Sequence, residues 1–164
     1  MTAPAIRRYP DPALATPCRP VERFDADLRA LADDLLAAMR AAPGIGITAA
    51  HVGLALRLVV IELEGAVRVY ANPVVEWASD ERALHPEGSV SMPGVGDVVE
   101  RPARVRVRFQ DLDGQERVEE AAGLLAVCLQ HEIDQLDGIF WLRRLSPLKR
   151  DRLLRRYEKM RRRE

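Results

Sequence analysis

Hydrophobic residues recur at helical spacing in residues 23–44, RFDADLRALADDLLAAMRAAPG. The apolar positions lie three or four residues apart, at Leu28, Leu31, Leu35 and Met39. Either Asp25 or Asp27 can cap the start of a helix, and a Pro-Gly pair follows its end. The segment therefore predicts an amphipathic helix with one buried face.

Two later regions have the pattern of strands. Residues 57–63 (RLVVIEL) and 67–73 (VRVYANP) are rich in β-branched residues, and the three residues between them suit a tight turn. In residues 103–119 (ARVRVRFQDLDGQERVE), apolar residues alternate with arginine before DLDG turns the chain into a second strand. This alternation predicts an antiparallel sheet with one buried face. Because no aromatic residues interleave with the arginines, a solvated face explains them better than a nucleic-acid surface does.

Helical spacing returns from Glu120 to Gly138 and again in the basic segment 148–163. The order helix, strands, helix, helix predicts an α+β fold, in which antiparallel sheets pack around a central inner helix. An N-terminal and a C-terminal helix complete this prediction. We expect residues 1–147 to form the domain and residues 148–164 to add a basic C-terminal helix to it.

The composition is that of a globular protein. The chain has 164 residues, of which 48% are hydrophobic and 5% aromatic. No segment approaches the roughly 18 apolar residues of a membrane helix, and the N-terminus lacks the apolar core of a signal peptide. We expect a cytoplasmic monomer without membrane contact. Cys18 and Cys128 have no metal-binding spacing, and Cys128 lies on an apolar helical stripe.

Two glycine-rich segments carry candidate chemistry. Residues 44–53, GIGITAAHVG, place two glycines beside an apolar run and a histidine, which suggests that the backbone approaches another group closely. Residues 85–94, HPEGSVSMPG, form a segment bounded by proline and glycine that carries Glu87, Ser89 and Ser91. Each segment taken alone has a simple structural explanation, as a turn or a loop.

A third segment, LQHEIDQLDG at residues 129–138, begins like a metal-binding helix. His131 and Glu132 open the His-Glu-x-x-His pattern, in which two imidazoles four residues apart hold a metal and the glutamate handles its water. Gln135 occupies the place of the second histidine. A neutral amide is a poor ligand for zinc or ferrous iron.

In this order and spacing, the three segments resemble the motifs of the peptide deformylases. Those motifs read Gly-x-Gly-x-Ala-Ala-x-Gln, Glu-Gly-Cys-hydrophobic-Ser and Gln-His-Glu-x-Asp-His. The resemblance extends nearly end to end, from IRRYPDPAL to LSPLKR. It implies a hydrolase that removes the formyl group from N-formylmethionyl peptides. It also implies a divalent metal, iron or zinc, held by one cysteine and two histidines.

The resemblance assigns roles to eleven residues. The substrate-binding positions are Gly44, Ile45, Glu87 and Gly88. The catalytic positions are Gly46, His51, Val90 and Glu132, where His51 replaces a glutamine that donates to the oxyanion. Of the metal ligands only His131 is kept, since Ser89 replaces the cysteine and Gln135 replaces the second histidine. Gly96 also takes the place of an arginine that binds the peptide backbone.

These replacements predict a degenerate metal site. Losing a thiolate and an imidazole removes most of the free energy of metal binding, and without the metal no water is activated. We therefore expect iron or zinc to be absent or weakly bound, and deformylation to be weak or absent. We expect the pocket to be retained for a formylated peptide or a related small ligand. Whether the protein is an enzyme stays open.

Two alternatives use the same residues differently. One is an active hydrolase with a rearranged metal site, in which His51 joins His131 as a ligand. The other is metal-free nucleophilic chemistry, with Ser89 as nucleophile and His131 as base. The sequence identifies no third group to support such a pair.

The C-terminal segment concentrates positive charge. The whole chain is formally neutral, but residues 143–164 carry eleven Lys/Arg against three Asp/Glu, so the rest is net acidic by eight. In the family the C-terminal helix docks on the ribosome, so residues 148–164 could contact RNA phosphates. A solvated amphipathic helix, packed on the domain through Leu153, Leu154 and Tyr157, explains the same residues equally well.

Overall fold

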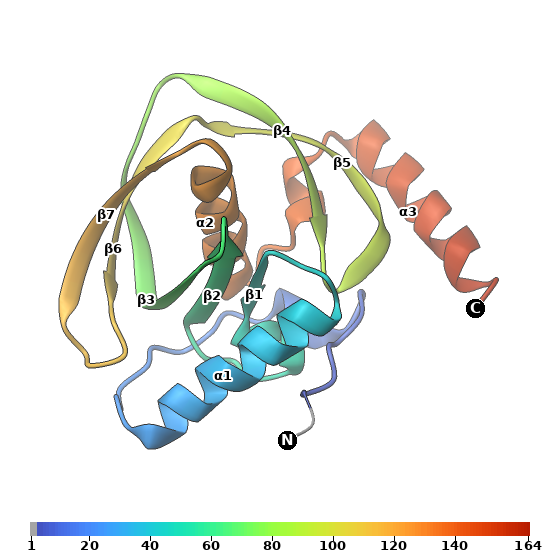
Figure 1. The fold of residues 1–164 in the computed structure, drawn as a ribbon. Coiled ribbons are helices and arrows are strands. Elements are labelled where there is room, and N and C mark those ends of the chain that lie inside the picture. Colours follow the sequence, from blue (N-terminus) through green and yellow to red (C-terminus); the bar gives the residue numbers. More distant parts are fainter. Residues whose placement is uncertain (1–2) are drawn as a thin grey trace.

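A five-stranded sheet and a two-stranded ribbon surround a central helix (Figure 1). The computed structural model describes residues 3–164. The α-helices described there are α1 (Ala26–Ala41), α2 (Gly123–Leu136) and α3 (Pro147–Arg161). The strands are β1 (Gly46–Thr48), β2 (Leu58–Leu63), β3 (Ala66–Ala78), β4 (Arg82–Ser89), β5 (Met92–Pro102), β6 (Arg104–Gln110) and β7 (Glu116–Ala122). The 3-10 helices are η1 (Pro12–Ala15), η2 (Ala49–Val52) and η3 (Trp141–Arg144).

The sheets are antiparallel, and the predicted α+β class is confirmed. The larger sheet has the order β1-β2-β3-β6-β7, and β4 pairs with β5 alone. Both predicted strand pairs form, as the β2–β3 and β6–β7 hairpins. The central helix begins at Gly123 and not at Glu120, because residues 120–122 end strand β7. The segment 85–94 is not a loop, since it belongs to β4, β5 and the tight turn between them.

Residues 58–61 of strand β2 are buried on both faces, which is why they form an uninterrupted apolar run. Val59 and Ile61 pack in the core cluster that contains α2. Leu58 and Val60 pack in the cluster that contains α1. Helix α2 therefore lies inside the fold, between the large sheet and the β4–β5 ribbon (Figure 1).

A third core cluster attaches helix α3. Leu153 and Tyr157 of α3 are buried in it together with Met92 and Val99 of β5 and Trp141 of η3. The rest of α3 runs along the edge of the molecule (Figure 1). Within residues 3–164, no helix is long and apolar enough to cross a membrane.

Candidate active site

A cavity of about 660 Å³ lies where β1, η2, the end of β4 and α2 meet. Ten residues with predicted site roles line it, namely Gly44, Ile45, Gly46, His51, Glu87, Gly88, Ser89, Val90, His131 and Glu132. Gln135 is the exception, because it is not among the lining residues. Cys128, one turn before His131 on α2, also lines the cavity, although the sequence indicated only a core position for it.

The two glycines at the start of β1 allow close packing around the cavity. A Cβ atom at Gly46 would lie 2.6 Å from Oε2 of Glu132, and one at Gly44 would clash with Val90. Only a residue without a side chain lets the backbone of β1 lie this close to α2. The close approach that the sequence suggested therefore brings the Glu132 carboxyl group against the β1 backbone.

His131 is held by a carboxylate. Its Nδ1 lies 2.8 Å from Oε1 of Glu87, so the ring donates there when Nδ1 carries a proton. Burial lowers the pKa of His131, but the negative charges of Glu132 and Glu87 outweigh burial and raise it above its usual value. The hydrogen bond leaves Nε2 as the ring nitrogen free to face the cavity.

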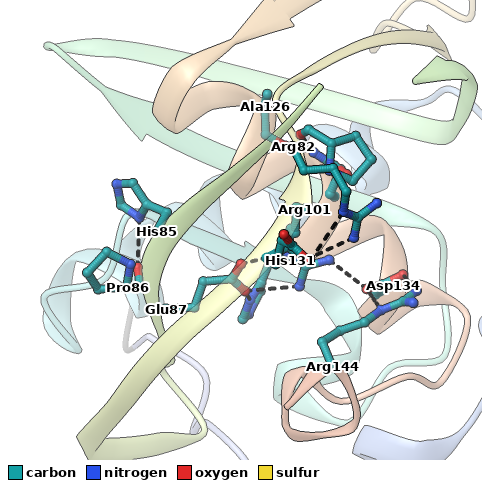
Figure 2. Close-up of polar contacts among 12 residues, drawn as sticks. Arg82, His85, Pro86, Glu87, Arg101, Ala126, His131, Asp134 and Arg144 are labelled. Carbon is teal, nitrogen blue, oxygen red and sulfur yellow. Dashed lines mark hydrogen bonds and ion pairs between the residues drawn. The ribbon is translucent and has the colours of Figure 1, made fainter. Parts of the chain in front are cut away.

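A buried ion network lies behind Glu87 (Figure 2). Arg101 of β5 donates from Nε and Nη2 to the two carboxylate oxygens of Glu87, at 2.6 and 2.9 Å. Its Nη1 donates to Asp134 at 2.9 Å, and Arg144 donates to the same aspartate. Burial raises the pKa of Glu87, but the hydrogen bonds from His131 and Arg101 outweigh it and bring the pKa to about 2. Glu87 is thus a fixed anion that orients His131.

His51 is buried, with 1% of its surface exposed, and its ring is fixed from one side. Its Nδ1 lies 2.9 Å from the backbone nitrogen and 3.0 Å from Oγ1 of Thr48. A backbone N–H only donates, so Nδ1 is an acceptor and the neutral ring carries its proton on Nε2. Burial and the nearby His131 lower the pKa of His51 to about 3, so the ring stays neutral. Its Nε2 has no hydrogen-bond partner among the residues that the structure describes.

Glu132 is also buried, at 3% exposure, and its Oε1 has no hydrogen-bond partner in the described part of the chain. Burial raises the pKa of this carboxyl group to about 7, and the charge of Glu87 adds to the effect while His131 opposes it. Near neutral pH the group can therefore either accept or donate a proton.

Ser89 and Gln135 have other partners. Oγ of Ser89 accepts a hydrogen bond from the Ser91 backbone at 3.1 Å. Nε2 of Gln135 donates to the Leu14 carbonyl at 2.8 Å, so this amide supports η1. Within residues 3–164, no three His, Cys, Asp or Glu side chains come together as a metal site.

Sequence reasoning missed the support behind His131. The sequence did not identify Glu87 as the group that orients His131, but within residues 3–164 Ser89 makes no hydrogen bond to His131, so the two do not form a catalytic pair. Arg101 was missed because it precedes the alternating arginines of β6 and lies 14 residues from Glu87. Arg101 could have been found as a basic residue in a strand that pairs with the strand of Glu87, because oppositely charged side chains on paired strands are candidate ion pairs.

Comparisons with known proteins agree with the fold. The family described as polypeptide deformylase matches residues 3–151. A peptide deformylase-like protein of Brucella melitensis is 62% identical over 99% of this chain and 100% of its own length. The crystal structure of a peptide deformylase from Legionella pneumophila has a TM-score of 0.93 and 36% identity, covering 98% of this chain and 96% of that one.

Rhizobium meliloti has two similar proteins. One, named peptide deformylase-like, is 59% identical over 100% of this chain and 96% of its own length. The other, named peptide deformylase, is 45% identical over 97% of this chain and 94% of its own length.

Proposed function

The chain belongs to the peptide deformylase family, and from this premise we propose that it is a deformylase-like protein with a degenerate metal site. It keeps the family's cavity but hydrolyses N-formylmethionyl peptides weakly or not at all. The observation that carries this proposal is the orientation of Gln135, whose amide donates to the Leu14 carbonyl and does not line the cavity. The side chain at the position of the second histidine ligand thus differs from that ligand in its chemistry and, as a glutamine, points away from the cavity.

The remaining side chains do not fit a catalytic metal. Such a site needs about three protein ligands and an open position. Ser89 offers a hydroxyl, which is not deprotonated near neutral pH and which already accepts a backbone hydrogen bond. Of the three family ligand positions, 89, 131 and 135, only His131 offers a strong metal ligand, through Nε2. One imidazole is too few ligands to hold iron or zinc in stoichiometric amount.

The contacts of His51 argue against the rearranged metal site. A metal would need the lone pair of Nε2, but the Thr48 backbone N–H makes Nδ1 the acceptor and leaves the proton on Nε2. Binding metal would therefore require loss of that proton or a flip of the ring away from Thr48. The alternative, a rearranged metal site that uses His51 and His131, predicts one metal per chain in the wild type and loss of that metal in His51→Ala.

The relatives support a role other than general deformylation. Rhizobium meliloti has a protein named peptide deformylase and another named peptide deformylase-like, and this chain is more similar to the second. In that organism a protein with each of the two names is present, so a separate role for the deformylase-like one would leave a deformylase in place. We propose the same division for this protein, with a formylated peptide or a related small molecule as its ligand and the cytoplasm as its compartment.

A second partner is proposed for helix α3. Leu153 and Tyr157 anchor the helix in the core, and Leu154 and Met160 pack against the same cluster. Its exposed basic residues are Lys149, Arg152, Arg155, Arg156, Lys159 and Arg161. Exposed lysine and arginine side chains on a helix that is anchored in the core can bind the phosphate groups of RNA. We therefore propose the ribosome as a partner of residues 148–164.

The metal content of the protein, purified without added metal or chelator, tests the main proposal. We expect well under one iron or zinc per chain and little deformylation of a formyl-Met peptide. The protein of Rhizobium meliloti that is named peptide deformylase, purified in parallel, is the positive control. One metal per chain together with efficient deformylation would show that the site is intact.

A further inference from the structure

A second cavity, of about 630 Å³, lies against a different face of helix α2 from the active site. Gln130, Ile133 and Asp134 of α2 line it, whereas His131 and Glu132 line the active-site cavity. Among residues 3–164, the two cavities share no lining residue. The volume is within the range of small-molecule sites, so this cavity can hold a ligand of its own.

Four arginines from separate parts of the chain converge on this cavity, which we call the arginine groove. They are Arg57 before β2, Arg82 on β4, Arg101 on β5 and Arg144 on η3. Figure 2 shows Arg101 and Arg144 in contact with Asp134, and Arg82 beside Arg101. The acidic residues of the lining are Glu100, Asp134 and Asp137. The lining therefore carries one more positive charge than negative charges.

The innermost arginine fixes the position of its neighbour. The side chain of Arg101 is 5% exposed, and it is shared between Asp134 and Glu87, which lies on the side of the active site. Asp134, held in this way, accepts from Nε and Nη2 of Arg144. Nη1 of Arg144 has no acceptor among residues 3–164, and this side chain is 46% exposed. Arg144 is thus held in place by protein and keeps N–H groups for a ligand.

Arg57 and Arg82 are held in the same manner. Nη1 of Arg57 donates to Asp137 and to the Leu136 carbonyl, which leaves Nε and Nη2 without an acceptor in the described part of the chain. Nη2 of Arg82 donates to the Glu100 carbonyl, and its Nε lies 3.5 Å from the Glu100 carboxylate. The two side chains are 18% and 49% exposed, so both are accessible from solvent. Such pre-positioned arginines reduce the entropy that a bound anion must remove.

Most of the remaining lining is apolar. It consists of Pro73, Val74, Val75, Pro102 and Ile133. An apolar group bound against these side chains is desolvated, which favours binding by about 25 cal/mol per Å² of buried apolar surface. The groove therefore suits a ligand that joins an anionic group to an apolar body.

The charge of the lining selects the kind of anion. A carboxylate has one negative charge, which matches the excess of one positive charge, and its two oxygens fit the N–H groups of a guanidinium. A phosphate monoester carries about two negative charges near neutral pH, so it would add an unbalanced charge beside three acidic residues.

We infer that the arginine groove is a binding site for a small monocarboxylate with an apolar or aromatic body. Arg57, Arg82 and Arg144 bind the carboxylate, and the apolar wall formed by β3, Pro102 and Ile133 contacts the body of the ligand. This site goes beyond the proposed function, because it uses none of the active-site residues and needs no metal.

The test is an NMR titration of the full, methyl-labelled chain with phenylacetate, in EDTA and at constant ionic strength. Phenylacetamide, which has nearly the same shape without the charge, and phenyl phosphate are the control ligands. We expect saturable binding of phenylacetate with a dissociation constant below about 10 mM, and binding of both controls at least about fivefold weaker. The methyl signals of Val74 and Val75 should shift, while those of Leu124 and Val127 in the active-site cavity should not.

Arginine variants test the contacts. Arg144→Gln and Arg57→Gln should each weaken phenylacetate binding at least about tenfold, because each removes a charged hydrogen-bond donor. Arg106→Gln is the matched control, since Arg106 is also an exposed arginine paired with one carboxylate, that of Glu120, but lies outside the groove. It should bind as the wild type does. The methyl spectrum of each variant shows whether it is folded.

Four results would overturn the inference. They are the absence of saturable binding, shifts confined to the active-site methyl groups, amide or phosphate binding as tight as that of the carboxylate, and equal loss of affinity in Arg106→Gln and the groove variants. Because EDTA is present throughout, these outcomes do not depend on whether the active site binds metal.

Discussion

Restoring the two lost ligands, as Ser89→Cys with Gln135→His, should restore metal binding at a measurable cost to the metal-free protein. Gln135 now donates to the Leu14 carbonyl at 2.8 Å, and a histidine turned toward the cavity would leave that buried oxygen without its donor. The expected cost is about 1–3 kcal/mol. For a chain of this size, that lowers the melting temperature by about 2–12 °C.

Zinc should more than reverse this loss. A site that holds zinc at a thousand times its dissociation constant gains about 4 kcal/mol, because the metal binds only the folded state. The double variant should therefore melt below the wild type in EDTA and above it in zinc, and it should contain nearly one metal per chain.

The assay is calorimetric melting with and without zinc, together with metal analysis of the purified proteins. Each single variant is a control. It has only two strong metal ligands, His131 and the one residue introduced, so it should hold well under one metal per chain. A double variant that is folded but remains free of metal would refute the reasoning, because it would mean that the loop and helix no longer present the ligands to one point.

Three further predictions concern the ion network of Glu87, the side chain of Ser89 and helix α3. Arg101→Met should lower the free energy of unfolding by about 3–5 kcal/mol in urea titrations, because it leaves the buried Glu87 carboxylate without its cation, whereas Arg144→Met, at an exposed side chain, should cost under about 1 kcal/mol. Equal effects would mean that burial does not decide the cost. Ser89 should not react with a serine-directed fluorophosphonate, because in the described part of the chain its Oγ has no hydrogen bond to His131 or another base that could take its proton. Labelling that Ser89→Ala abolishes would overturn this. The amount of protein that pellets with ribosomes should fall steeply as the salt concentration rises, and it should be lost when exposed cations of α3 are changed to glutamate. These substitutions are preferred to truncation, because removing α3 would also remove core residues. Pelleting that does not depend on salt would contradict the prediction. The cations to change are Arg152, Arg155, Arg156 and Lys159.

The periodic elements could be predicted from the sequence alone. Apolar residues at helical spacing identified α1, and alternating valine and arginine identified β6. The motifs likewise identified ten of the residues that line the cavity, because motif residues keep their order along the chain. The ribbon of β4 and β5 was not predicted as strands, since its prolines and glycines are typical of loops and the two strands pair only with each other.

The tertiary structure decided which way the site's polar atoms face. The sequence left His51 as either a donor or a metal ligand, and the Thr48 backbone, folded back at the start of η2, makes Nε2 the donor. From the sequence, Gln135 was a weak candidate metal ligand. In the structure its amide donates to the carbonyl of Leu14, 121 residues away in the chain, and so does not line the cavity. Spacing along a helix determines which residues share a face. The hydrogen bond that a buried side chain makes depends on which backbone group, from elsewhere in the chain, lies within about 3 Å of it.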